Sequence, residues 1–175
     1  SGSLVLQTST SSDSGAGGSI ELIVSQGDDD SNGGSITVEA GDSDGNAGGS
    51  VSLTSGDASS SGGVATSGAV NIHSASSAST GNMYMMSGDA NAGHSGSVQI
   101  ESGTATGGAS GSLSVSVQSS TTGGGRIVVS SGVSTHASSD GGSVSLTSGS
   151  VTASSSGLFS IQTASGINEG TSGAL

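Results

Sequence analysis

The chain has 175 residues and a formal net charge of −12 at pH 7, with 34 Gly, no Pro, no Cys and a single basic residue, Arg126. An acidic chain with one cation lacks the basic patch that binds phosphate backbones, so we expect no nucleic-acid partner. No stretch approaches about 18 consecutive apolar residues, so the sequence predicts no membrane span. Leu, Ile, Val and Phe make up roughly 18% of the chain, which with this charge is typical of disordered segments. Their regular spacing argues against disorder.

A repeat of the form Gly-Ser-apolar-x-apolar recurs along the whole chain. Such internal repeats are the first feature to establish, because they decide the architecture. Successive opening glycines, which we call the repeat glycines, lie 13 to 19 residues apart, about 15.5 on average. The sequence thus contains eleven full repeats and the start of a twelfth. The repeat glycines are Gly2, Gly18, Gly34, Gly49, Gly68, Gly81, Gly96, Gly111, Gly125, Gly142, Gly157 and Gly173.

Each full repeat contains two large apolar residues separated by one residue, which is mostly polar, as at Ser52, Asn71 and Gln99. A spacing of two places both apolar side chains on one face of a β-strand. The sequence therefore predicts one short, half-buried strand in each repeat. The pairs are Leu4/Leu6, Ile20/Leu22, Ile36/Val38, Val51/Leu53, Val70/Ile72, Met83/Met85, Val98/Ile100, Leu113/Val115, Ile127/Val129, Val144/Leu146 and Phe159/Ile161.

The second half of each repeat is rich in Gly, Ser, Ala, Thr and Asp, and it fits either a loop or a second strand of small residues. Boundary glycines such as Gly48, Gly49 and Gly56 are expected to supply the positive φ of tight turns. One coil of about 15 residues cannot bury its own apolar face, so coils must stack.

The sequence predicts an all-β fold, a β-solenoid (parallel β-helix or β-roll) of about eleven coils of roughly 15–16 residues. Larger coils with three strands and protruding loops are the alternative. We expect residues 1–175 to form a single repetitive β-solenoid segment that is part of a longer repeat array, because the chain starts and stops inside a repeat.

Two acidic turns are the candidates for a metal site. Asp42 and Asp44 alternate with small residues in Asp-Ser-Asp-Gly-Asn, as at the start of an EF-hand loop, although Leu53 stands where that loop has its Glu. Asp28 and Asp30 occupy the equivalent turn one repeat earlier. Oxygen ligands on two stacked turns predict a shared Ca²⁺ site, and a solvated acidic turn that limits aggregation is the alternative.

The sequence offers no constellation of catalytic residues, and we predict that the protein is not an enzyme. His73, His94 and His136 share no position in the repeat, so we expect no catalytic or metal cluster from them. Serine is too frequent for a Ser-His-Asp triad to be singled out, and no nucleophile elbow is present.

Residues 48–58, Gly-Gly-Ser-Val-Ser-Leu-Thr-Ser-Gly-Asp-Ala, resemble the Gly/Ser/Thr-rich repeat regions of very large predicted cell-surface or extracellular proteins of diatoms and related algae. The resemblance extends over essentially the whole chain. It implies an extracellular or cell-surface location and a role in a wall, an adhesive or an appendage, without catalytic residues.

The repeat and this resemblance together predict a structural repeat segment of an extracellular filament, fibre or surface appendage. Its expected partners are further copies of the chain or neighbouring repeat chains in a fibre. An adhesin stalk, or a surface module that binds Ca²⁺ or carbohydrate, is the alternative. The Ser and Thr content allows O-linked glycans, on composition alone.

Overall fold

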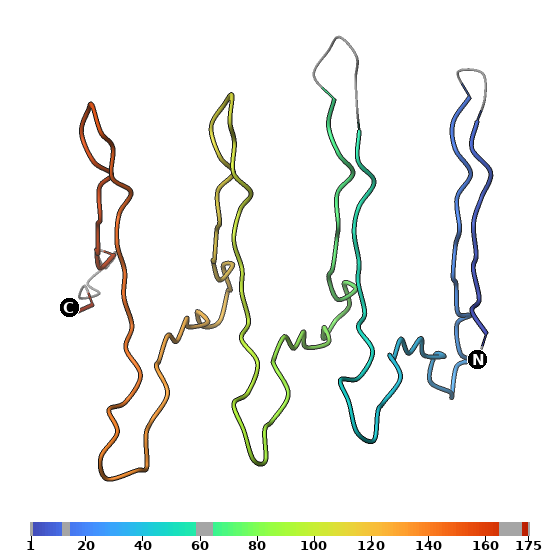
Figure 1. Cartoon of the computed structure of the whole chain (residues 1–175), viewed down its shortest axis with the longest axis horizontal. Helices are drawn as coiled ribbons and strands as arrows, with labels where there is room; N and C mark the ends of the chain where they lie inside the picture. Colours follow the sequence, from blue (N-terminus) through green and yellow to red (C-terminus); the bar gives the residue numbers. More distant parts are fainter. Residues whose placement is uncertain (1, 12–14, 59–64, 165–172, 175) are drawn as a thin grey trace. The chain divides into compact units, whose positions relative to one another are not determined.

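The computed structural model describes residues 2–11, 15–58, 65–164 and 173–174. Within these residues the chain forms no helix and no strand, and it is mostly coil with short turns and bends. The chain divides into two units, Ser1–Met85 and Met86–Leu175, which we call unit 1 and unit 2. Within each unit, extended segments reverse direction at loops (Figure 1).

The predicted β-solenoid is wrong, and so is its alternative of larger coils with three strands, because the described residues form no sheet. A solenoid requires each strand to pair with its neighbour through a continuous ladder of backbone hydrogen bonds. The backbone hydrogen bonds in this part of the chain instead close turns and loops. Alternating apolar residues such as Val51 and Leu53 favour an extended backbone, but they do not specify which segment its N–H and C=O groups will pair with.

Four backbone hydrogen bonds between described residues join two glycines, and each closes a loop. The donor is a repeat glycine, and the acceptor lies seven residues after the preceding repeat glycine. The second half of the repeat, which varies in length and sequence, therefore lies inside the closed loop. The N–H groups of Gly49 and Gly68 donate to the C=O groups of Gly41 (2.8 Å) and Gly56 (3.0 Å) in unit 1, and those of Gly142 and Gly157 donate to Gly132 (2.9 Å) and Gly149 (2.9 Å) in unit 2.

From Gly18 onwards, every repeat glycine except Gly81 also lies close to one residue of the preceding repeat, the residue six positions after that repeat's own glycine. A Cβ added at Gly49 would lie 3.2 Å from the Ala40 Cβ, and one at Gly142 would lie 3.2 Å from the Ser131 Cβ. We call this arrangement the glycine contact. The sixth residue is half-buried in five of the repeats, at Thr8, Ala40, Ser55, Ser87 and Ser148.

The glycine contact explains the repeat glycine differently from the sequence-based prediction. The backbone at Gly48, Gly49 and Gly56 does not adopt the left-handed conformation, so the predicted positive φ at these positions is wrong. At Gly49 the absent side chain is what matters, because a Cβ there would also lie 3.2 Å from the backbone nitrogen of Gly41. A side chain at Gly49 would force one of the two segments to shift by a few tenths of an ångström, so glycine favours their close approach.

In the part of the chain that the structure describes, the second half of the repeat is loop, and the second strand of small residues is not formed. Bends fall about ten residues after a repeat glycine in most repeats. Small, hydroxyl-bearing and acidic residues favour such reversals, because their side chains hydrogen-bond to the local backbone. The described bends include residues 44–46, 77–79, 91–93, 106–108, 121–122 and 152–154.

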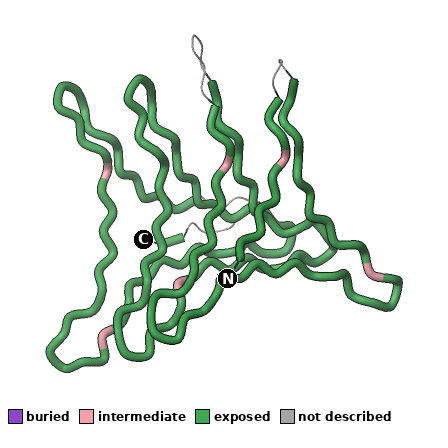
Figure 2. The backbone as a smooth tube through the Cα atoms, turned by 45° about the vertical axis from the view of Figure 1, so that its right-hand side comes forward, coloured by how far each residue is buried: buried purple, intermediate pink, exposed green. Residues whose placement is uncertain are grey.

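No side chain of the described residues is fully buried (Figure 2). The apolar pairs were predicted to lie on a half-buried face, yet both members are exposed. The first residue of the pair is 50–61% exposed in ten of the eleven repeats, and the second is 60–73% exposed in all eleven. Each apolar position of the repeat therefore has a similar exposed fraction in nearly all of the repeats.

Candidate functional site

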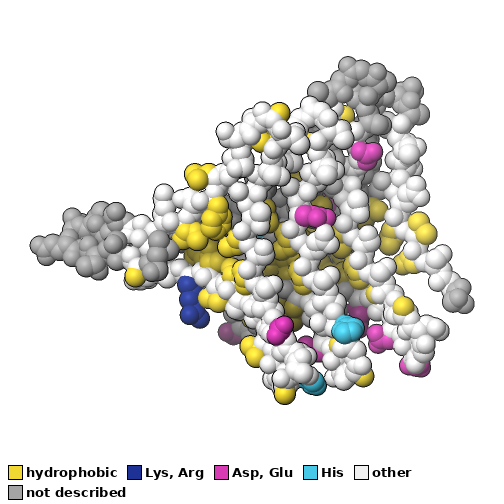
Figure 3. Space-filling view, turned by 60° about the vertical axis from the view of Figure 1, so that its left-hand side comes forward, with side chains coloured by type: hydrophobic (Ala, Val, Ile, Leu, Met, Phe, Trp, Pro, Cys, Tyr) yellow, Lys and Arg dark blue, Asp and Glu magenta, His cyan; other side chains and the backbone are white. Residues whose placement is uncertain are grey.

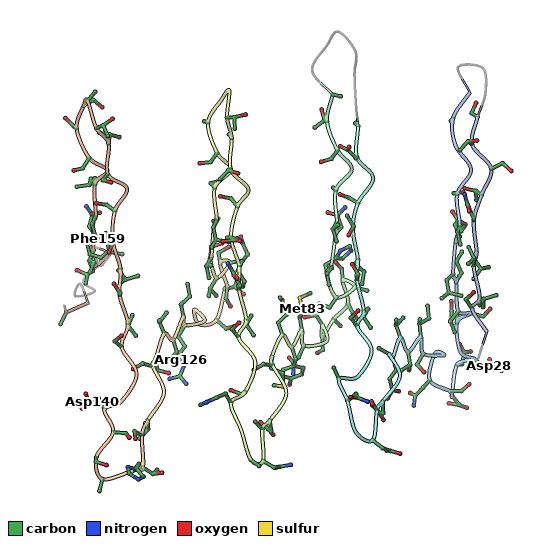
Figure 4. All side chains as sticks on the ribbon, in the orientation of Figure 1. Asp28, Met83, Arg126, Asp140 and Phe159 are labelled. Atoms are coloured by element: carbon green, nitrogen blue, oxygen red, sulfur yellow. The ribbon has the colours of Figure 1, made fainter. Side chains whose placement is uncertain are left out.

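Asp28 opens a hydrogen-bonded turn on the surface of unit 1 (Figure 4). The Ser31 N–H donates to the Asp28 C=O at 2.9 Å, and the Asp28 N–H donates to the Ser31 Oγ at 3.1 Å. The Asp29 N–H donates to Asp28 Oδ1 at 2.9 Å. One Asp28 carboxylate oxygen therefore helps to fix the turn, as Asp side chains do in local side-chain-to-backbone bonds. Asp30 is exposed in the same turn.

Asp42 and Asp44 lie in the loop that the Gly49–Gly41 hydrogen bond closes. The Asn46 N–H donates to the Ser43 Oγ at 3.1 Å, and the chain bends at residues 44–46. Both carboxylates are exposed to solvent. The loop thus presents two anionic side chains on a short reversal, without burying either.

The described residues do not bring the two acidic turns together into one metal cluster. Nowhere in this part of the chain do three or more His, Asp or Glu side chains lie close enough to hold an ion, whereas Ca²⁺ takes six to eight oxygen ligands. Carboxylate and carbonyl oxygens are the ligand types that Ca²⁺ prefers. A Ca²⁺ site shared by Asp28, Asp30, Asp42 and Asp44 therefore stays a prediction.

His136 has the most polar contacts of the three histidines, and all of them are local. Its Nδ1 lies 3.1 Å from the Ser138 Oγ and accepts the Ser138 N–H at 3.3 Å. Its own N–H donates to the Ser134 Oγ at 3.3 Å. These bonds fix the turn at residues 136–139. His73 and His94 are exposed, and no cluster joins the histidines in the described residues.

The two units differ in charge. Nine of the 13 acidic residues fall in unit 1, whereas unit 2 contains four acidic residues and Arg126. The formal charges are therefore −9 for unit 1 and −3 for unit 2. Arg126 and Asp140 lie on different segments of unit 2 (Figure 4), and both are exposed.

The exposed apolar pairs are the second candidate surface, and hydrophobic side chains reach the surface between polar ones (Figure 3). Residues 49–56 and 142–149 have the same sequence, Gly-Ser-Val-Ser-Leu-Thr-Ser-Gly. Val51 and Leu53 are 53% and 72% exposed in unit 1, and Val144 and Leu146 are 52% and 69% exposed in unit 2. Sequence reasoning found these residues but assigned them to a core, because alternation alone cannot distinguish a core face from an open one.

Comparison with family models, curated proteins and solved structures gave no match to this chain. None of the described residues belongs to a helix with the length and hydropathy that a bilayer crossing requires.

Proposed function

We propose that this chain is a structural repeat segment of an extracellular filament, fibre or surface appendage, assembled through contacts between copies or neighbouring repeat chains. The observation that carries the proposal is the recurrence of one exposed apolar pair in eleven repeats, with nearly constant exposure at each position. The resemblance of the repeat to Gly/Ser/Thr-rich repeat regions of algal cell-surface or extracellular proteins implies an extracellular or cell-surface location.

The physical argument starts from the cost of leaving these side chains in water. Removing apolar surface from water contributes about 25 cal/mol per Å², and contiguous exposed apolar surface usually marks an interaction site. Many similar and individually weak contacts are more compatible with a periodic assembly than with the binding of a single ligand. The repeat therefore favours association along its length, with each pair adding a similar increment.

The test is assembly of the purified full chain at several concentrations and ionic strengths, followed by analytical ultracentrifugation and negative-stain electron microscopy. We expect species larger than the monomer, growing with concentration and salt. Replacing Leu53 and Leu146 by Ser should reduce association, whereas Leu→Met at the same positions should preserve it. A chain that stays monomeric under every condition would overturn the proposal.

A second candidate is an adhesin stalk or a surface module that binds Ca²⁺ or carbohydrate. It is favoured by the exposed, locally hydrogen-bonded acidic turns at residues 28–31 and 42–46. It differs from the first candidate in requiring a metal or a sugar for its effect. Enzymatic activity is part of neither proposal.

A further inference from the structure

Asn32 and Gly33 directly follow the acidic turn at residues 28–31. Every other asparagine of the sequence is followed by Ala, Ile, Met or Glu. The difference matters chemically, because the backbone nitrogen that follows an asparagine can attack the side-chain amide and close a five-membered ring. Glycine allows this attack best, since it has no Cβ to block the approach and its backbone adopts many conformations.

The structure leaves this pair of residues open to such a reaction. Asn32 and Gly33 are both exposed, and a Cβ added at Gly33 would meet nothing within 4 Å. None of the backbone hydrogen bonds between described residues uses the Gly33 N–H. The nucleophile and its target therefore lie on adjacent residues, where an intramolecular attack has a large advantage over an attack by a second molecule.

Two other asparagines of unit 1 lie in less reactive settings. The Asn46 N–H donates to the Ser43 Oγ at 3.1 Å, and the next residue, Ala47, has a Cβ. The Asn82 Nδ2 donates to the Tyr84 Oη at 2.9 Å, so its side-chain amide is held by a neighbour. Asn32 thus combines an exposed side chain with a following glycine, and it is the position where the reaction should occur first.

We propose that Asn32 is a self-modification site, at which the Gly33 nitrogen converts the asparagine to aspartate or isoaspartate. A base from the solvent removes the Gly33 amide proton, and the nitrogen forms a bond to the Asn32 Cγ. The bond from Cγ to Nδ2 breaks, and ammonia leaves with a proton. Water then adds to either carbonyl of the cyclic imide and opens the ring. No group is oxidised or reduced, and water is the only co-reactant.

The modification changes the turn in two ways. Either product adds one negative charge beside the acidic residues of the turn at 28–31. Isoaspartate also directs the backbone through the side chain, which adds one carbon to the main chain just before the repeat glycine Gly34. A Cβ at Gly34 would clash with the Val24 side chain, so the added carbon lies next to a glycine contact.

The experiment uses the full chain, incubated at physiological temperature and pH and then cleaved by a protease specific for Glu. Residues 22–39, which lie between two Glu cleavage sites, contain Asn32 as their only asparagine, whereas Asn46 falls in the next peptide. Each conversion raises the peptide mass by about 1 Da, and fragment ions locate it. Position 32 should convert about tenfold or more faster than Asn46. Equal rates, or no conversion at position 32, would overturn the inference.

Gly33→Ala tests the role of the glycine without disturbing its surroundings, because the added Cβ meets open space and the backbone there is not left-handed. This variant should slow conversion at position 32 about tenfold or more. Gly45→Ala is the matched control, since a Cβ at Gly45 also meets nothing within 4 Å and Gly45 does not follow an asparagine. Unchanged conversion in Gly33→Ala would contradict the proposal.

The inference does not rest on the proposed structural role. A chain that stays monomeric would overturn that role and leave the chemistry at Asn32 untouched. A chain that assembles but shows no preference for position 32 would overturn the modification site alone.

Discussion

Residues 49–56 of unit 1 and 142–149 of unit 2 have the same sequence, and each lies between two loops closed by glycine–glycine hydrogen bonds. Ser55 and Ser148, at the sixth position, are both half-buried. The flanking loops differ: residues 41–49 contain two Asp, whereas residues 132–142 contain His136 and one Asp. The comparison teaches that the repeat sets the local environment, while the loops set the charge that a partner meets.

Removing the apolar pair should have the largest effect. Val144→Ser with Leu146→Ser should weaken self-association about 100-fold or more, since burying a Val or Leu side chain contributes about 1.5–3 kcal/mol. The same change at Val51 and Leu53 should weaken it to a similar extent, because the two segments have the same sequence and nearly equal exposure. Sedimentation equilibrium gives both dissociation constants, and unchanged association in both variants would contradict the role of the pairs.

Calcium should distinguish the units next. If the acidic turns hold Ca²⁺, isothermal titration calorimetry should detect binding with a Kd of about 0.1–1 mM, the range of extracellular modules. Asp42→Asn with Asp44→Asn should weaken binding about tenfold or more, because it removes two anionic ligands. Asp140→Asn in unit 2 is the matched control and should change little. The absence of heat at millimolar Ca²⁺ would remove the predicted site.

Alanine at the repeat glycines tests the glycine contact within each unit. A Cβ at position 142 would lie 3.1 Å from the backbone nitrogen of Gly132, whereas one at position 157 would lie 3.5 Å from that of Gly149, an ordinary contact. Gly142→Ala should therefore lower the protection of its own amide against hydrogen exchange about fivefold, a cost of about 1 kcal/mol. Gly157→Ala is the control, with less than a twofold change expected.

The same experiment in unit 1 compares Gly49→Ala with Gly68→Ala. A Cβ at position 49 would lie 3.2 Å from the Gly41 nitrogen, and one at position 68 would lie 3.7 Å from the Gly56 nitrogen. The protection of the amide against hydrogen exchange should again fall more in the variant with the closer contact, Gly49→Ala. Equal protection in all four variants would show that the loops do not depend on this close approach.

The smallest effect is expected at the first loop of unit 1. The Thr8 Oγ1 donates to the Gly18 C=O at 3.1 Å in an exposed setting, so Thr8→Val should cost about 0.5 kcal/mol. About a twofold faster amide exchange across this loop should result. The corresponding residue facing Gly111 in unit 2 is Ser102, and Ser102→Ala should leave exchange unchanged. A larger effect from Ser102→Ala would reverse the comparison.

The local features of this chain follow from sequence better than its long-range contacts do. The Asp-Ser-Asp-Gly-Asn segment at residues 42–46 indicates a reversal, and the structure bends there, because the bonds that fix it lie within a few residues. Four repeat glycines, among them Gly49 and Gly142, lie where a loop closes. Their physical role, close approach to residues such as Ala40, depends on a contact nine residues away and was not predicted.

The prediction of the fold was wrong for a related reason. The alternation of Val144 and Leu146 is compatible with a strand, but a strand exists only when a second backbone segment supplies hydrogen bonds in register. The small Ser, Thr and Gly residues around these pairs carry little information about register, since they fit many neighbours equally well. The prediction that Asp28 and Asp42 lie side by side relied on stacked coils. The described residues form no such stack, so this prediction lost its basis.

The closed loops have a mechanical consequence. One hydrogen bond closes the loop between Gly49 and Gly41, and another closes the loop between Gly157 and Gly149. While the bond holds, the eight residues of the loop bear none of a force that pulls on the chain ends. Breaking that bond under load would add at most about 26–29 Å of contour length, at 3.3–3.6 Å per residue. The loop can close again when the load falls, because the chain remains covalently intact. A thread built from such repeats would dissipate work through many small, reversible extensions before its covalent backbone bears the full force.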